Sequence, residues 1–222
     1  MIEVNGLNVS IQGVPILRSV NLSVQKGEMV GLVGRNGAGK TTLMRCIMGL
    51  LKPAAGHIQI GQTDVTGMEG FWRARNQVGY MPEDRRLIPD LSVEENILVP
   101  AWAIKIKDPA VRLRWIYQLM PEVEEFAPRL AASLSGGQQK LVAMARALMV
   151  GEQILLLDEP FEGVAPMLCK RLIEVIMALK GKGLSVLISE SDYTYTRSMV
   201  DKSYSIERGS ISAGNQMTRA PV

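Results

Sequence analysis

Apolar residues recur along this chain with two periods, one typical of strands and one typical of helices. The alternation over 20–24 predicts a half-exposed antiparallel strand, paired across a turn at 13–15 with a strand over 2–4. The unbroken apolar run over 29–33 predicts a strand buried on both faces, as in a parallel sheet. Further strands are predicted over 58–60, 78–81, 154–157, 186–189 and 203–206.

Helical periodicity dominates the middle of the chain. Apolar residues spaced for one helix face predict helices over 41–50, 93–98, 109–126, 138–149 and 167–179. The predicted fold class is therefore α/β, with a core formed by residues 1–82 and 151–222. This core carries an N-terminal antiparallel β subdomain and is interrupted by an inserted helical subdomain, residues 83–150. The tail after Ala213 has no pattern and is predicted to fray.

Composition narrows the function classes. With 222 residues, 47% of them hydrophobic, the chain is long enough to bury a substantial core. A net charge of +3 without a basic stripe is too small to imply nucleic-acid binding, so no nucleic-acid partner is expected. The single histidine, His57, excludes a multi-histidine metal site, and Cys46 and Cys169 are expected to be buried free thiols. No apolar run spans a bilayer and no signal peptide begins the chain, so a cytosolic protein is predicted.

A glycine-rich loop follows the buried strand at 29–33 and precedes the helix at 41–50. Its glycines let backbone N–H groups turn toward an anion, and the helix adds the positive end of its dipole. Lys40 is expected to reach the β- and γ-phosphates of a nucleotide, and the Thr41 hydroxyl to bind magnesium. The predicted phosphate-binding residues are Gly34, Arg35, Asn36, Gly37, Ala38, Gly39, Lys40, Thr41 and Thr42.

Two acids end the apolar strand at 154–157. A strand that ends in carboxylates at the carboxyl edge of a parallel sheet places them where open α/β folds bind ligands. With the phosphate loop upstream, Asp158 is predicted to hold magnesium and Glu159 to act as the general base for the attacking water. The alternative for an isolated Asp-Glu pair is a solvated strand end.

A third segment, Leu-Ser-Gly-Gly-Gln-Gln at 134–139, begins a long helix. Ser135 and the backbone of Gly136, Gly137 and Gln138 would lie at the N-terminus of that helix, which is a natural anion site. Taken alone, Ser-Gly-Gly is equally a simple helix cap. Its place between the two phosphate-site motifs gives it specificity, and there the chain resembles the ATP-binding subunits of ABC transporters, whose signature is LSGGQ.

This resemblance covers the chain from Ile2 to about Gly214 and implies an ATPase that uses ATP and Mg²⁺. In that family, subunits dimerise head to tail, and each signature closes over the other subunit's ATP. The closest match is to the smaller ATPase of branched-chain amino-acid uptake permeases, with urea or amide importers as the alternative. The segments that carry this match are Gly79–Arg86, Leu91–Asn96 and Glu162–Pro166.

Three positions depart from the common family pattern. Ile11 stands where an aromatic residue usually stacks on adenine, and Ser191 stands at the position of the switch histidine, so a catalytic contribution by Ser191 would pass through water. Glu83 replaces a glutamine; a carboxylate can still ligate magnesium but cannot donate a hydrogen bond. The residues after it, Arg85, Arg86, Leu87 and Ile88, are candidates for gripping a membrane subunit.

The sequence therefore predicts the ATPase of an importer at the cytoplasmic face of the inner membrane. Its expected partners are a second ABC ATPase, identical or different, integral membrane permease subunits and, indirectly, a substrate-binding protein. Two alternatives remain from other classes. One is a nucleotide-gated dimerisation module with little turnover, and the other is a soluble ABC ATPase of repair or translation.

Overall fold

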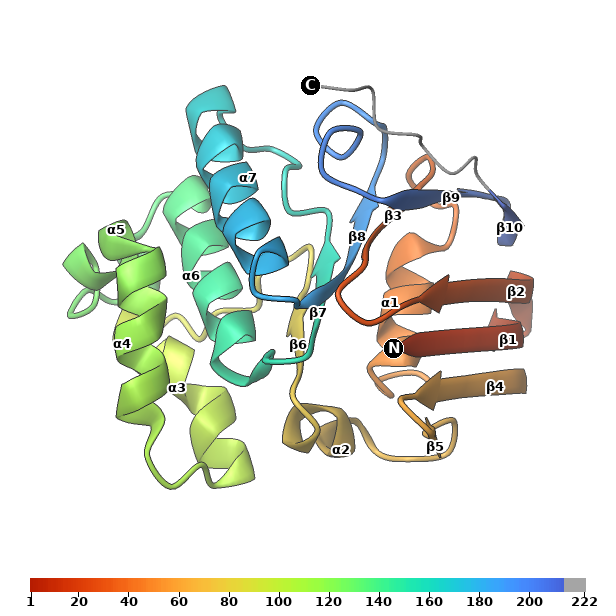
Figure 1. Ribbon diagram of the computed structural model, residues 1–222, viewed down its shortest axis with the longest axis horizontal. Helices are drawn as coiled ribbons and strands as arrows, with labels where there is room; N and C mark the ends of the chain where they lie inside the picture. Colours follow the sequence, from red (N-terminus) through yellow and green to blue (C-terminus); the bar gives the residue numbers. More distant parts are fainter. Residues whose placement is uncertain (214–222) are drawn as a thin grey trace.

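The computed structural model describes residues 1–213, in which two sheets lie side by side with helices beside them (Figure 1). The predicted tail after Ala213 lies outside the described residues. A four-stranded antiparallel sheet has the order β2-β1-β4-β5, and a six-stranded, mainly parallel sheet has the order β10-β9-β3-β8-β7-β6. The strands of the first sheet are β1 (Ile2–Ile11), β2 (Val14–Val24), β4 (Ala55–Ile60) and β5 (Thr63–Asp64). Those of the second are β3 (Met29–Val33), β6 (Val78–Met81), β7 (Ile154–Asp158), β8 (Ser185–Glu190), β9 (Lys202–Glu207) and β10 (Ser210–Ala213).

The first hairpin is longer than its sequence pattern predicts. Strands β1 and β2 pair antiparallel from Ile2 opposite Val24 to Ile11 opposite Val14, with register shifts between Val4 and Ser10. Bulges of this kind interrupt the alternation on which the prediction of short strands rested.

The parallel sheet separates two hydrophobic cores. On β7, Ile154 and Leu156 face one core, whereas Leu155 and Leu157 face the other. The first core lies between the two sheets and includes α1 (Lys40–Ile47), and the second lies under α3 (Val93–Ile104), α6 (Gly136–Val150) and α7 (Pro166–Lys180). Burial on both faces explains why these strands lack alternation.

One of the helices predicted from the sequence is divided in two in the structure. The predicted helix over 109–126 is two helices, α4 (Pro109–Leu119) and α5 (Pro121–Glu125). Pro121 has no N–H and favours an extended residue before it, and Met120 is non-helical at φ −134°. Pro100, by contrast, is accommodated inside α3. The 3₁₀ turn Ala131–Ser133 then leads into α6.

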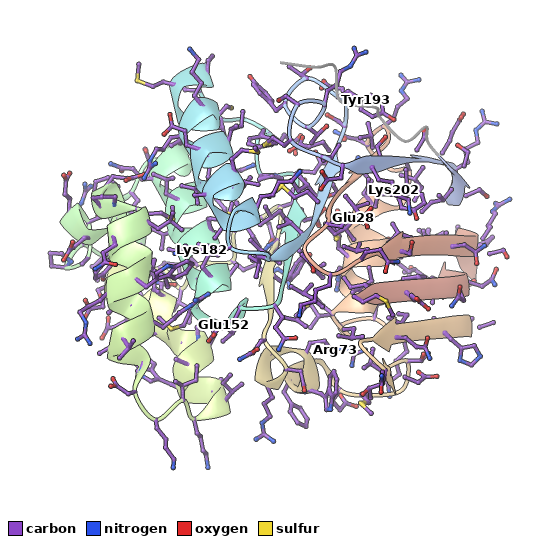
Figure 2. All side chains as sticks on the ribbon, viewed as in Figure 1. Glu28, Arg73, Glu152, Lys182, Tyr193 and Lys202 are labelled. Atoms are coloured by element: carbon purple, nitrogen blue, oxygen red, sulfur yellow. The ribbon has the colours of Figure 1, made fainter. Side chains whose placement is uncertain are left out.

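A short helix that the sequence did not predict, α2 (Gly70–Arg75), carries the largest fully buried side chain. The Arg73 guanidinium, labelled in Figure 2, donates to the carbonyls of Ile47, Val65 and Met68. It thereby holds the end of α1 against the loop after β5. No helix among residues 1–213 is both long and apolar enough to cross a membrane.

Candidate functional site

The glycine loop connects β3 to α1, as the sequence predicts. A Cβ on Gly34 would lie 2.2 Å from the carbonyl oxygen of Ile206, so only glycine fits between the loop and β9. Gly39 caps α1 in the left-handed region at φ 112°, with no side-chain capping bond. Within the described residues no side chain therefore caps the start of α1, and a helix end in that condition attracts anions.

The Lys40 side chain is folded back into this loop. It is 3% exposed, and its ammonium donates to the carbonyls of Gly34 at 2.5 Å and Arg35 at 3.2 Å. Its Nζ also lies 3.0 Å from Oε1 of Glu159. The structure therefore joins the predicted phosphate-binding lysine to the predicted base, although 119 positions separate them in the numbering.

Glu159 is held in an unusual backbone conformation. Its φ is 49°, in the left-handed region, which costs about 1–2 kcal/mol for a residue with a Cβ. The Glu159 N–H donates to the carbonyl of Ser189 at 3.1 Å, and its carbonyl accepts from Lys140 at 2.6 Å. Glu159 is 4% exposed, and its Oε2 atom is buried without a hydrogen-bond partner among residues 1–213. One oxygen of the carboxylate is thus available to accept a proton or a water.

Asp158 is buried completely and is surrounded by hydroxyl groups. Its Oδ1 accepts from Ser189 Oγ at 2.5 Å, and its Oδ2 accepts from the Tyr80 hydroxyl at 3.2 Å. Burial raises the pKa of Asp158, and the Ser189, Thr41 and Tyr80 hydroxyls act in the opposite direction. Burial, together with the Asp158 charge, raises the pKa of Tyr80, so the phenol stays a donor.

Thr41 and Glu83 meet at the same end of the sheet. Thr41 Oγ1 lies 3.5 Å from Glu83 Oε2, and both residues line a cavity of about 260 Å³ with Tyr80, Asp84 and Arg86. Hydroxyl and carboxylate oxygens are the donors that Mg²⁺ prefers, so the chemistry of Thr41, Glu83 and Asp158 fits that ion.

The signature segment forms a complete helix cap. Ser135 Oγ accepts from the Gln138 N–H at 3.3 Å, and Gln138 Oε1 accepts from the Ser135 N–H at 3.0 Å. Ser135 and Gly136 are exposed. The start of α6 and the loop between β3 and α1 lie at the same end of the molecule, apart from each other (Figure 1). No hydrogen bond joins these two segments within the part of the chain that the structure describes.

The loop after β6 is tied to the signature helix. The Arg85 guanidinium donates to the Gly136 carbonyl at 3.3 Å and to Gln139 Oε1 at 3.1 Å. Arg146, two turns further along α6, donates to the carbonyls of Arg85 and Arg86, and both of these residues have left-handed backbones. Among the residues predicted to contact a membrane subunit, Arg86 and Ile88 are exposed, whereas Arg85 is hydrogen-bonded to α6.

All three departures, Ile11, Glu83 and Ser191, lie at exposed positions. Ser191 follows β8 directly, and Ile11 ends β1 with 40% of its surface exposed. Sequence reasoning missed Ser189 and Tyr80, whose hydroxyls contact Asp158, and Lys140, which contacts Glu159. The parallel register that places Ser189 opposite Asp158 was the missing information, and no local sequence pattern encodes it.

The site combines a strand, a glycine loop, a helix with a buried lysine, and an acidic end on β7, which β8 separates from β3 in the same sheet. These features define a P-loop nucleotide-binding protein. The comparisons with known proteins go further, because the family model described as ABC transporter matches residues 17–162. The chain belongs to this family, and it is an ATP-binding subunit with ATPase activity.

Relatives with different transport roles are similarly close. BraG of Pseudomonas aeruginosa, a high-affinity branched-chain amino acid transport ATP-binding protein, is 34% identical over 88% of this chain and 84% of its own length. LptB of Escherichia coli, the lipopolysaccharide export system ATP-binding protein, is also 34% identical, over 91% of this chain and 85% of its own length. Overall identity therefore does not choose between the two roles.

Solved structures agree with the fold. The structure of an ATP-binding subunit of an ABC transporter superposes with a TM-score of 0.86 at 27% identity, covering 98% of this chain and 90% of that one. An ATP-binding cassette of an ABC transporter in its ADP conformation gives a TM-score of 0.83 at 26% identity, covering 96% and 89%. These similarities confirm the predicted α/β, ABC-type ATPase fold.

Proposed function

We propose that the chain is the ATP-hydrolysing subunit of an importer for branched-chain or other hydrophobic amino acids. The proposed ATP hydrolysis rests on one observation, the grouping of Lys40, Glu159 and Asp158 near the carboxyl ends of β3 and β7. Lys40 pairs with Glu159, and Asp158 is the residue before Glu159. The backbone N–H groups of the loop over 34–42 hold the phosphates of ATP. The Lys40 ammonium binds the β- and γ-phosphates in exchange for the carbonyls and the Glu159 carboxylate that it contacts in this structure.

Glu159 acts as the general base. The water oxygen bonds to the γ-phosphorus while its proton passes to the Glu159 carboxylate, and the bond from the γ-phosphorus to the bridging oxygen breaks. ADP takes the bond's electron pair, and inorganic phosphate carries the new oxygen. The buried Oε2 atom supplies the acceptor, and the held backbone of Glu159 fixes where that atom lies.

Magnesium binding is proposed for Thr41, Asp158 and Glu83. The ion, when bound, neutralises charge that develops on the β- and γ-phosphates. Ser189 and Tyr80 orient the Asp158 carboxylate through its two oxygens. Glu83 is the exposed member of this set, so its carboxylate can follow movements of the loop after β6.

The signature is proposed to act across a dimer. Its capped helix start is exposed and makes no hydrogen bond to the phosphate loop of its own chain, so an ATP-bearing loop from a second ATPase is its natural complement. The second ATPase is identical or different. Closure of this dimer moves permease subunits that bind Arg86, Leu87 and Ile88. Hydrolysis of ATP then reopens the dimer. The location that we propose for the protein is therefore the cytoplasmic face of the membrane.

The choice of amino acids over other cargo rests on the similarity to BraG and on the segments Gly79–Arg86, Leu91–Asn96 and Glu162–Pro166. The test is uptake of labelled leucine in source cells whose chromosomal copy carries Glu159→Gln. We expect leucine uptake to fall at least tenfold, while Glu125→Gln, at an exposed position in α5, leaves it unchanged.

Each other outcome assigns a different role. Loss of labelled urea uptake with intact leucine uptake would indicate an amide importer, and a lipopolysaccharide defect alone would indicate export. Equal phosphate release by the purified wild-type protein and by Glu159→Gln, each with its permease, would indicate a gated dimerisation module.

A further inference from the structure

The side chain of Lys140 is an unusual feature of α6. Lys140 is 5% exposed, and its Nζ donates to the Glu159 carbonyl at 2.6 Å. Burying a charged ammonium costs several kcal/mol unless polar groups compensate for the lost water. Within the described chain, its hydrogen-bond acceptor is this one backbone oxygen.

The bond joins two elements with different roles. Lys140 lies five residues after Ser135, on the helix whose start carries the signature. Glu159 follows β7, and its left-handed backbone aims its carboxylate at Lys40. The Glu159 N–H is held by Ser189 on one side of the residue, and the Glu159 carbonyl is held by Lys140 on the other.

We propose that Lys140 is a positioning residue for ATP hydrolysis, which fixes the peptide of Glu159 so that the carboxylate meets the attacking water. The same bond connects the signature, which serves the partner's ATP, to the base that serves the chain's own ATP. Movement of α6 on dimer closure therefore reaches Glu159 through Lys140.

Lys140 has acidic side chains among its neighbours. Burial lowers the pKa of Lys140, and the carboxylates of Glu190 and Glu162 oppose that change. Glu190 is itself fixed, because its Oε1 accepts from the Phe161 N–H at 3.1 Å. Lys140 thus has acidic neighbours beside it while its ammonium bonds the Glu159 carbonyl.

The test compares Lys140→Met, which keeps the length of the stem but removes the donor, with Lys140→Arg, which keeps a donor. Lys26→Met, at an exposed position, is the matched control. We expect Lys140→Met to lower kcat for ATP roughly 10- to 100-fold, the scale of a misplaced catalytic group, with KM changed less than about twofold. Lys140→Arg should recover most of the lost kcat, and Lys26→Met should match wild type.

A kcat for Lys140→Met within twofold of wild type would overturn the proposal. So would a fall in kcat with a matching loss of ATP affinity and ATP-driven dimerisation, because that pattern indicates a packing role. If Lys140→Met does not fold, Lys140→Leu, which also lacks a donor, is measured by the same criteria.

The inference rests on the proposed role of Glu159, and a double mutant separates the two. Lys140→Met should add little to the loss in a Glu159→Gln background, because both act through one carboxylate. Full additivity would overturn the role of Lys140, whereas near-normal turnover by Glu159→Gln alone would overturn the role of Glu159.

Discussion

Lys40 Nζ lies 3.0 Å from Glu159 Oε1, so the lysine of the phosphate loop and the acid after β7 form a buried ion pair. Both side chains are almost fully buried. A γ-phosphate that reaches the loop must compete with Glu159 for the Lys40 ammonium. When the phosphate binds the ammonium, the Glu159 carboxylate is released beside the attacking water. The ion pair therefore connects phosphate binding to release of the base.

Replacing Glu159 with glutamine tests this exchange. Glutamine cannot take a proton from water, so kcat should fall about 10²- to 10⁴-fold, the usual contribution of a general base. ATP affinity should hold or rise, because a neutral amide competes less strongly for Lys40. Phosphate release and ATP titration measure the two effects, and Glu125→Gln, at an exposed position, is the control. A turnover within tenfold of wild type would contradict the assignment.

Two substitutions at Ser135 separate capping from nucleotide contact. Ser135→Ala should lose roughly 1 kcal/mol of unfolding free energy with the cap, whereas Ser135→Asp should keep the cap. Aspartate, however, places a negative charge where the partner's phosphates are expected. ATP-driven dimerisation, followed by size-exclusion chromatography in a Glu159→Gln background, should therefore be weaker in both variants and weakest for aspartate. Normal dimerisation of Ser135→Asp would argue against a signature contact.

The loop glycines should differ in their tolerance of alanine. At Gly34 the added Cβ meets the Ile206 carbonyl at 2.2 Å, so the loop or β9 must shift, at a cost of roughly 3 kcal/mol or more. At Gly37 nothing lies within 4 Å, and only the φ of +81° opposes alanine, at about 1 kcal/mol. Urea unfolding of the two variants measures the difference. Equal losses would show that the close approach to β9 is relaxed in solution.

Glu190 should make stability depend on pH. Burial raises the pKa of Glu190 to about 7, and its neighbours Glu159, Lys140 and Asp192 modify this value. The folded protein holds the proton longer than the unfolded chain does, so stability should decline as pH rises from about 4.5 to 7 and stay level above. A shift of this size corresponds to about 3 kcal/mol. Urea unfolding between pH 5 and 8 should show a shallower decline for Glu190→Gln, and an unchanged profile would contradict the expectation.

Local sequence patterns predicted the structure best where all residues of a motif lie in one short segment. The structure confirms the positions predicted for the glycine loop, for its flanking strand and helix, and for the two acids at the end of β7. The prediction of one long helix over 109–126 was wrong, because Pro121 breaks the helix although the apolar periodicity continues on both sides of it. The short elements α2 and β5 contain too few residues to establish a period.

The sequence by itself determined the ABC-type ATPase class, because the phosphate loop, signature and acidic strand end are contiguous segments whose chemistry depends on adjacent residues. Only the tertiary structure decided which distant groups meet. The Ser189 hydroxyl reaches Asp158 because β7 and β8 pair in one register. Lys140 reaches Glu159 because α6 packs under the sheet. Such pairings depend on strand register and helix packing, which arise from burial summed over the whole chain and leave no mark on any short segment.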